Sequence, residues 1–243
     1  RTASVIDEFV QRIPIEGAPA TENTTVYVAY DNTNLYFGIY AGHSNPSAIR
    51  ANRVDRDRAF GDDRISIIFD PFMDQQRGYS FGVNAYGVQS DAILGSGAGY
   101  GNRDSAWDAL FESAGTLVDD GWTAEIAIPF KSLRYPQRPN GEIHSWGFQI
   151  ERQIRSKNET VTWSPVSTDV MGFLSQTGVL NGMEGLSTQR NLEILPTLTA
   201  MQVGTLSDED QFEIAKAKEA GINVKYGLTS NLTLDFTYNP DFS

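Results

Sequence analysis

The sequence has 243 residues, 40% hydrophobic and 11% aromatic, so it is long and apolar enough to bury a core. Asp and Glu number 31 against 19 for Lys and Arg, and the net charge of −12 argues against nucleic acid or an anionic lipid surface as partner. The absence of cysteine excludes disulfides and thiolate chemistry. The sequence contains no run of about 18 apolar residues, so no transmembrane helix is predicted. The abrupt start at Arg1 leads us to expect a processed chain without its signal peptide.

The first two predicted strands form a hairpin. Residues 1–25 are polar and rich in turn formers, so we expect a segment that lies on the surface. Apolar residues then alternate with others in 26–30 and again in 35–41, which is the period of half-buried strands. The turn formers of 31–34 separate the two strands and predict the hairpin.

The middle of the chain predicts more short strands. Residues 44–64 are charged and are interpreted as a loop or an exposed strand. Alternation then predicts strands at 65–69 and 79–83, and the Gly-rich residues 95–106 predict a loop. Further strands are expected from their aromatic and apolar alternation at 107–111, 114–118, 122–128 and 146–150. Pro129 should end the strand that begins near Trp122, because proline has no N–H for a ladder.

Many short strands with Gly and Pro turns predict an all-β fold, a β-sandwich of jelly-roll type over residues 1–188. No long helical period occurs, although 206–220 could form either a short helix or an acidic loop. The pattern changes in 189–243, where two-faced strands are predicted at 192–203, 222–228 and 232–238. Those strands suit either the start of an outer-membrane β-barrel or an ordinary soluble hairpin, and pattern alone leaves both open.

Two motifs resemble a known family. One runs from the acidic turn before Gly121-Trp122 through Glu125 to Ile128-Pro129-Phe130, and the other is Val28-Ala29-Tyr30-Asp31 in the hairpin. Together they resemble the carbohydrate-binding module family 9 fold at the front of bacterial outer-membrane proteins of unassigned activity. Residues 231–243 resemble the start of the barrel in those proteins, which would continue beyond this truncated region. The resemblance implies the cell envelope of a Gram-negative bacterium, in the outer membrane or on its periplasmic or extracellular face.

Residues for catalysis are scarce. The two histidines, His43 and His144, stand in no nucleophile or metalloprotease motif, so we interpret both as surface or loop residues. Among the many carboxylates, Glu125 is notable because it lies in the middle of a strand, on the face opposite Trp122. Its ordinary interpretation is an ion pair with an arginine. We therefore predict no catalytic residue.

Calcium is a possible cofactor, because Ca²⁺ takes carboxylate and carbonyl oxygens and the resembled modules can hold it. No EF-hand loop is present. The candidate ligands are four aspartates that lie close in sequence: Asp62, Asp63, Asp70 and Asp74.

Aromatic rings and polar groups predict sugar binding, because pyranose rings stack on aromatic faces while charged and amide groups bind the hydroxyls. Trp122 and Trp146 alternate with apolar neighbours and are assigned to the core. The resembled modules close their sugar slot with two rings, which Phe60 and Trp163 would match here. Ser66 stands where those modules carry an acidic residue. The remaining candidates for ligand binding are Trp107, Arg53 and Arg152.

The resemblance therefore implies a non-catalytic domain that binds an oligo- or polysaccharide in the cell envelope, with a role in carbohydrate catabolism. One alternative is a structural, plug-like periplasmic domain that serves an outer-membrane barrel. Another is a membrane-associated hydrolase acting on O-glycosyl bonds. The predicted partners are a glycan and the outer membrane, and not nucleic acid, while the glycan and the oligomeric state are not set by the sequence.

Overall fold

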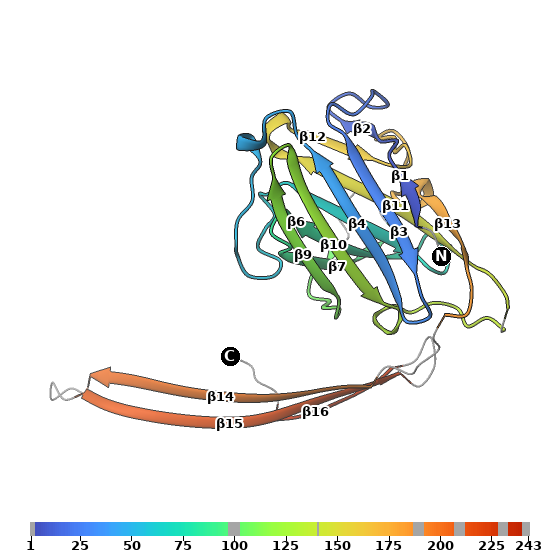
Figure 1. Ribbon diagram of the computed structural model, residues 1–243. Helices are drawn as coiled ribbons and strands as arrows, with labels where there is room; N and C mark the ends of the chain where they lie inside the picture. The colour runs from blue at the N-terminus through green and yellow to red at the C-terminus, as the bar shows by residue number, and fades with distance from the viewer. Residues whose placement is uncertain are drawn as a thin grey trace. The chain divides into compact units, whose positions relative to one another are not determined.

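The computed structural model describes residues 3–96, 103–139, 141–186, 192–206, 212–227 and 233–239. The chain divides into two compact units, Arg1–Ser187 and Thr188–Ser243. The first unit consists of two antiparallel sheets that pack face to face (Figure 1), so the predicted β-sandwich is confirmed.

One sheet has five strands in the order β1-β3-β4-β10-β9. Its strands are β1 (Ser4–Ile6), β3 (Thr24–Tyr30), β4 (Asn34–Gly42), β9 (Glu112–Val118) and β10 (Gly121–Pro129). Strand β10 pairs with both β4 and β9, and it ends at Pro129 as predicted. The predicted hairpin is confirmed in β3 and β4.

The other sheet has eight strands, in the order β2-β12-β11-β5-β6-β7-β8 with β13 beside β11. Its strands are β2 (Val10–Ile13), β5 (Arg64–Asp70), β6 (Arg77–Asn84), β7 (Gln89–Gly95), β8 (Arg103–Asp104), β11 (His144–Ile154), β12 (Glu159–Thr162) and β13 (Gly178–Met183). Short 3-10 turns punctuate the connections: η1 (Pro46–Ala48), η3 (Phe130–Ser132), η4 (Arg155–Lys157) and η5 (Leu174–Gln176).

The core lies between the two sheets, where every second residue of each strand points inward. Trp122 and Trp146 are fully buried there, which confirms their assignment to the core. Phe69 is central, because its ring packs within about 6 Å of the rings of Phe37, Phe148 and Trp146 (6.0, 5.6 and 5.8 Å between centroids). Because aromatic side chains are large, this layer contributes much of the apolar area that is buried in the core.

One predicted strand of the sandwich is wrong. Residues 107–111 form no strand, and β9 begins only at Glu112. The alternation there has another cause, since Trp107 packs against Tyr79 and Phe81 while Ala109 and Phe111 are buried in the core. An irregular segment with inward-facing aromatics thus imitates the pattern of a strand.

The second unit contains a three-stranded antiparallel sheet of β14 (Leu192–Leu206), β15 (Phe212–Gly227) and β16 (Thr233–Tyr238). The strands predicted at 192–203, 222–228 and 232–238 are confirmed over their described residues. The helix or loop expected for 206–220 is wrong for 212–220, which belongs to β15, while 207–211 lie outside the described residues. No helix among the described residues is long and apolar enough to cross a membrane.

Candidate functional site

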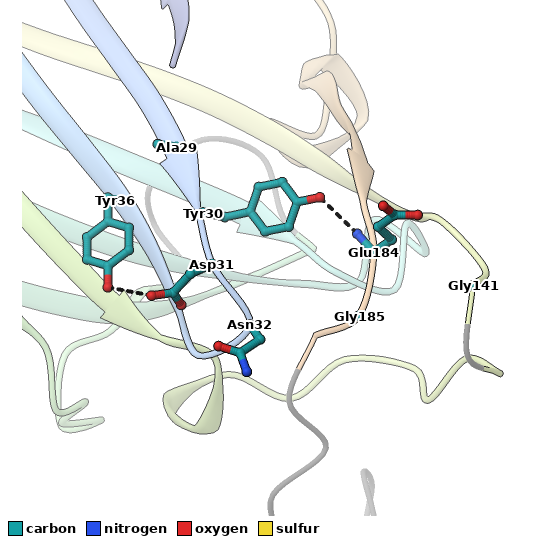
Figure 2. A pocket seen from close by; sticks show the side chains of 8 residues that line it. All are labelled: Ala29, Tyr30, Asp31, Asn32, Tyr36, Gly141, Glu184 and Gly185. Carbon is teal, nitrogen blue, oxygen red and sulfur yellow. Dashed lines mark hydrogen bonds between the residues drawn. The ribbon is translucent and has the colours of Figure 1, made fainter. Parts of the chain in front are cut away.

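A hollow lies at the end of the sandwich where β3 turns into β4 (Figure 2). We call it the turn hollow, and its volume is about 710 Å³. One wall comes from the β3–β4 turn and the other from the residues that follow β13 and from Gly141. Its lining residues are Ala29, Tyr30, Asp31, Asn32, Tyr36, Gly141, Glu184 and Gly185.

The wall on the hairpin side is held by the carboxylate of Asp31. Its Oδ1 accepts the backbone N–H groups of Thr33 (2.6 Å) and Asn34 (2.7 Å), which is the way an aspartate closes a tight turn. Its Oδ2 accepts the hydroxyl of Tyr36 at 2.9 Å. These bonds, the Thr33 N–H first, lower the pKa of Asp31 to about 2. The carboxylate is therefore ionised at neutral pH and fixes the Tyr36 ring at the rim.

The opposite wall is made largely of backbone. The Tyr30 hydroxyl donates to the carbonyl oxygen of Gly182 (3.0 Å) and accepts the backbone N–H of Glu184 (3.2 Å), so the residues after β13 are tied to β3. A Cβ atom added to Gly141 or Gly185 would meet no atom within 4 Å. The space in front of these two glycines is open.

Two phenol rings border the turn hollow from opposite faces of the hairpin, because Tyr30 pairs with the core residue Leu35 and Tyr36 pairs with Ala29. Glu184, Asp31 and Asn32 are exposed beside Tyr30 and Tyr36 (Figure 2). Aromatic faces stack on the C–H surface of a sugar, and carboxylate and amide groups bind its hydroxyls. The arrangement suits a neutral polyhydroxylated ligand better than an anion, which the two carboxylates would repel.

The two rings expected to close a sugar slot, Phe60 and Trp163, contact different parts of the sandwich. Phe60 is 47% exposed in the loop before β5, where the Arg64 guanidinium lies 5.8 Å from its ring centre. Trp163 follows β12 and packs against the core residue Phe148, with 5.3 Å between ring centres. A Cβ on Gly178 would come within 2.6 Å of the Trp163 ring. Among the described residues, no ring contact joins Phe60 to Trp163.

Two further predicted ligand-binding residues pack against the chain itself. Trp107 is partly buried, and its ring centre lies 5.1 Å from that of Tyr79. Arg53 is exposed, and its guanidinium lies 4.4 Å from the centre of the Tyr86 ring. A cation over a ring at this distance is a favourable contact, so the Arg53 guanidinium is already engaged by the Tyr86 ring.

Arg152 lies inside the sandwich rather than on a surface. It is fully buried, and its guanidinium links the two sheets. Nη1 donates to the carbonyl oxygen of Asn23 and to the Thr24 hydroxyl (2.8 and 2.9 Å), and Nη2 donates to the carbonyl oxygen of Gly42 at 2.6 Å. Burial lowers the pKa of Arg152 to about 10. The structure thus gives this arginine a structural role.

A row of four polar residues and one glycine crosses the outer face of the eight-stranded sheet, where the predicted slot would lie. We call it the polar row; strand register places its members side by side: Thr162, Glu151, Ser66, Gly82 and Ser90. All are buried. The Glu151 carboxylate is approached by Arg12 (Nη1–Oε2, 3.6 Å) and accepts Nε2 of Gln153 (3.2 Å). The chain's own side chains thus satisfy this carboxylate and cover the row.

The predicted calcium ligands are used within the chain. The Asp62 carboxylate accepts bonds from Asn52 and Asn84, and the Asp63 carboxylate accepts the N–H groups of Arg50 and Arg155. Asp70 and Asp74 accept the N–H groups of Gln75 and Gln76 in the turn after β5. Burial raises the pKa of Asp63 and Asp70.

These four aspartates do not form the acidic group that the described residues bring together. That group consists of Asp57, Asp91 and Asp108, whose carboxylate oxygens lie within 4.8 Å of one another. Arg56 enters it, with 2.6 Å between its Nη2 and Oδ1 of Asp91. The guanidinium already supplies the positive charge that a cation would bring.

Both histidines are buried, so a surface position is wrong for each. The predicted loop position holds for His43, which follows β4, and is wrong for His144, which begins β11. His43 lies 2.9 Å from the Ser156 hydroxyl through Nε2 and 3.9 Å from Glu22 through Nδ1, which resembles a Ser–His–acid triad. However, Nδ1 accepts the backbone N–H of Asn45 at 3.0 Å. The neutral ring then carries its proton on Nε2 and donates it to Ser156, so it cannot act as the base for that hydroxyl.

The turn hollow was not predicted as a site, although its hairpin was. Asp31 was assigned to the turn, and Tyr30 and Tyr36 to the flanking strands. Tyrosines that flank a tight turn are a usable signal in the sequence. Glu184 and Gly185 lie more than 140 residues away in the sequence, and only the fold shows that they face this turn.

Comparison with known proteins finds a family whose model covers most of the sandwich. The family described as carbohydrate family 9 binding domain-like matches residues 6–172, which confirms the predicted family 9-like domain. A domain of unknown function (DUF5916) matches residues 191–243. No curated protein sequence matches the chain.

Several solved structures are similar to the sandwich, of which two follow. One is a candidate carbohydrate-binding protein from Bacteroides uniformis ATCC 8492, with a TM-score of 0.55 and 16% identity over 74% of this chain and 86% of that chain. The other is a family 9 carbohydrate-binding module from Caldicellulosiruptor kristjanssonii in complex with cellotriose, with a TM-score of 0.47 and 16% identity over 76% and 84% of the two chains. At this identity the first likeness establishes the fold alone.

Proposed function

Because the chain belongs to the carbohydrate family 9 binding domain-like family, we propose that its sandwich binds a neutral glycan in the turn hollow without cleaving it. The observation that carries the proposal is the exposure of Tyr36 and Asp31 in one open hollow with Tyr30 and Glu184. These groups supply the Tyr36 ring and hydroxyl acceptors around the hollow, with Tyr30 as part of its wall.

The electrostatics of the hollow support binding rather than hydrolysis. A glycosidase needs one carboxylic acid that keeps its proton near neutral pH, which requires a raised pKa. The pKa of Asp31 is instead lowered to about 2, because the N–H groups of the turn stabilise its charge. Asp31 is therefore suited to accept sugar hydroxyls and unsuited to donate a proton.

The test is calorimetric titration of the full chain with cellotriose, xylotriose, mannotriose and laminaritriose. We expect saturable binding of at least one trisaccharide. Tyr36→Leu should weaken it about tenfold, since a lost stacking partner costs on the order of 1.4 kcal/mol. Tyr36→Phe keeps the ring and is the matched control, so it should retain most of the affinity. Flat titrations for every sugar, with a folded chain, would reject the proposal.

A second variant locates the site. Phe60 lies in the loop before β5, away from the hollow's lining residues, and is 47% exposed, so Phe60→Ala should leave the fold and the proposed site intact. We expect unchanged trisaccharide affinity. If Phe60→Ala removes binding while Tyr36→Leu does not, the glycan binds over the eight-stranded sheet and the turn hollow is excluded.

We also propose that the C-terminal sheet inserts into the outer membrane as part of a larger barrel. The supporting observation is the two-faced register beside β16: Ile194, Val224 and Phe236 align on one face, and Lys225 and Asp235 pair on the other. Farther along β15, Lys218 shares the face of Ile194. The apolar face is open, with Leu198 82% and Phe236 58% exposed. Strands of 15 and 16 residues exceed the length needed to span a bilayer, about 10 residues.

Association with lipid vesicles tests this second proposal. Leu198→Asp and Phe236→Asp in the full chain should abolish co-flotation with phosphatidylethanolamine and phosphatidylglycerol vesicles, because a charge on a lipid-facing strand is costly. Thr237→Asp changes the polar face of the same strand and is the matched control. Equal flotation of all variants would contradict insertion.

A further inference from the structure

A row of tyrosines leads from the turn hollow across the outer face of the five-stranded sheet. Tyr36 and Tyr40 lie four residues apart on β4, so both point outward, about 13 Å apart along the strand. Midway between them, Gly38 pairs with Tyr27 of β3. We call Tyr40, Tyr27 and Tyr36 the tyrosine row. Tyr36 also lines the hollow, so the two features are continuous.

Gly38 leaves room for the central ring. A Cβ on Gly38 would lie 3.7 Å from Cβ of Tyr27 and 4.0 Å from its Cδ2, so the Tyr27 ring extends toward the space that a larger side chain would fill. Tyr27 is nevertheless 48% exposed and Tyr36 is 37% exposed. Tyr40 is half-buried, so the row presents the Tyr27 and Tyr36 rings most fully to solvent.

Carboxylates hold the two outer rings. The Tyr36 hydroxyl donates to Asp31 at 2.9 Å, and this bond raises the pKa of Tyr36. A hydrogen bond to Asp120 likewise raises the pKa of Tyr40. Rings fixed in this way lose little freedom on binding, which favours their use as stacking platforms.

The charge of this face selects the kind of ligand. The exposed Glu125 pairs with Gly38 from the β10 side, so a carboxylate stands beside the centre of the row. The outward positions of β3, β4, β9 and β10, all described by the structure, contain no Lys or Arg. An anionic polymer would be repelled there, whereas neutral hydroxyls find acceptors.

We propose that the turn hollow and the tyrosine row form one extended site that binds a neutral linear polysaccharide along its length. The proposal rests on the proposed function of the hollow and adds to it. The hollow holds one part of the chain, and Tyr27 and Tyr40 stack on the sugar units that follow. A short oligosaccharide would occupy the hollow alone.

The test compares ligand lengths by calorimetry on the full chain, with tri- and hexasaccharides of the cello, xylo, manno and laminari series. We expect the preferred hexasaccharide to bind about tenfold more tightly than its trisaccharide. Tyr27→Leu should abolish that gain and leave trisaccharide affinity unchanged. Tyr27→Phe keeps the ring and should preserve the gain.

The outcomes separate the two proposals. If no sugar of either length binds, the proposed function itself fails. If the trisaccharide binds but the hexasaccharide binds no more tightly, or Tyr27→Leu leaves the gain intact, the extended site is overturned and the hollow stands. Hexalysine is titrated in parallel. If hexalysine binds and Tyr27→Leu weakens its binding, the face recognises cationic peptides and the glycan assignment of the row is overturned.

Discussion

The outer faces of the two sheets differ in what covers them. On the eight-stranded sheet, which we call the covered face, Val166, Phe173 and Leu174 pack over Ile68 and Leu94. On the five-stranded sheet, the bare face, Tyr27, Tyr36 and Val5 are exposed instead. Both faces belong to one sandwich, yet one buries its polar groups beneath other parts of the chain and the other offers its groups to solvent.

The difference explains why the expected site and the proposed site do not coincide. On the covered face, Glu151 is 2% exposed and is engaged by Arg12 and Gln153. A sugar binding there must first replace these contacts, which costs much of the binding energy. On the bare face, Asp31 and Tyr36 are already oriented and remain accessible. Pre-organised exposed groups favour binding, while the same chemistry under cover favours stability.

The largest expected effect is the loss of the aspartate that fastens the loop before β5 to the covered face. Asp62 accepts the N–H and Nδ2 groups of Asn52 (2.9 and 2.6 Å) and Nδ2 of Asn84 (2.8 Å). Asp62→Ala leaves these donors unsatisfied and should lower the free energy of unfolding by about 3 kcal/mol. Chemical denaturation measures the change.

The bare face provides the matched control for that substitution. Asp31 also accepts several hydrogen bonds, but its partners are exposed and can turn to water. Asp31→Ala should destabilise the fold much less than Asp62→Ala. Equal losses from the two variants would show that the faces are equally covered and would break the comparison.

Two glycines sharpen the comparison at a smaller scale. A Cβ on Gly82 of the covered face would lie 2.5 Å from Oγ of Ser90 and 3.2 Å from Oγ of Ser66. Gly82→Ala should therefore cost about 1 kcal/mol of stability. A Cβ on Gly38 of the bare face would make only ordinary contacts with Tyr27, so Gly38→Ala should change stability by less than about 0.5 kcal/mol. Thermal unfolding of both variants measures the contrast.

The two faces should also respond to acid in opposite directions. Burial raises the pKa of Asp70 above 3.8, so the folded state binds its proton first and stability rises as pH falls through that pKa toward 3.8. Asp31 has its pKa lowered to about 2, so its contribution is lost as pH falls from 3.8 to about 2. Unfolding free energies across pH 2 to 7 should show Asp70→Asn more stable than the parent at pH 7. A parent with a higher unfolding free energy than Asp70→Asn at pH 7 would contradict the raised pKa of Asp70.

Local patterns predicted most strands of the sandwich and little of its surface. The alternation of Trp122, Ala124 and Ile126 is a property of the sequence itself, and it appears as β10 with those residues buried. Residues 107–111 show the limit of the method, because Trp107 alternates with its neighbours without belonging to a strand. Packing between distant segments decides whether such an alternating segment becomes a strand, and the periodicity of the sequence does not reveal that packing.

The site was harder to predict for the same reason. Phe60 and Trp163 were paired by resemblance, but Trp163 turned toward Phe148 and the core. The tyrosine row, in contrast, follows from information that the sequence already held. Once 26–30 and 35–41 are paired across a tight turn, Tyr27 must face the neighbourhood of Gly38. Once the register of a predicted hairpin is known, the side chains that lie side by side on each of its faces are predicted as well.

The smallest expected effect concerns one hydrogen bond on the bare face. Tyr36→Phe removes the hydroxyl that donates to Asp31, while the turn N–H groups of Thr33 and Asn34 remain. Because those N–H groups are the main cause of the lowered pKa of Asp31, the pKa should rise only slightly from about 2. Carboxyl ¹³C NMR titration of the parent and the variant measures the change. A return to the ordinary aspartate value of about 3.9 would mean that the hydroxyl, and not the turn, holds the charge. In that case the Tyr36 side chain would both supply the ring of the hollow and keep the Asp31 carboxylate ionised, so the bare face would depend on this one side chain.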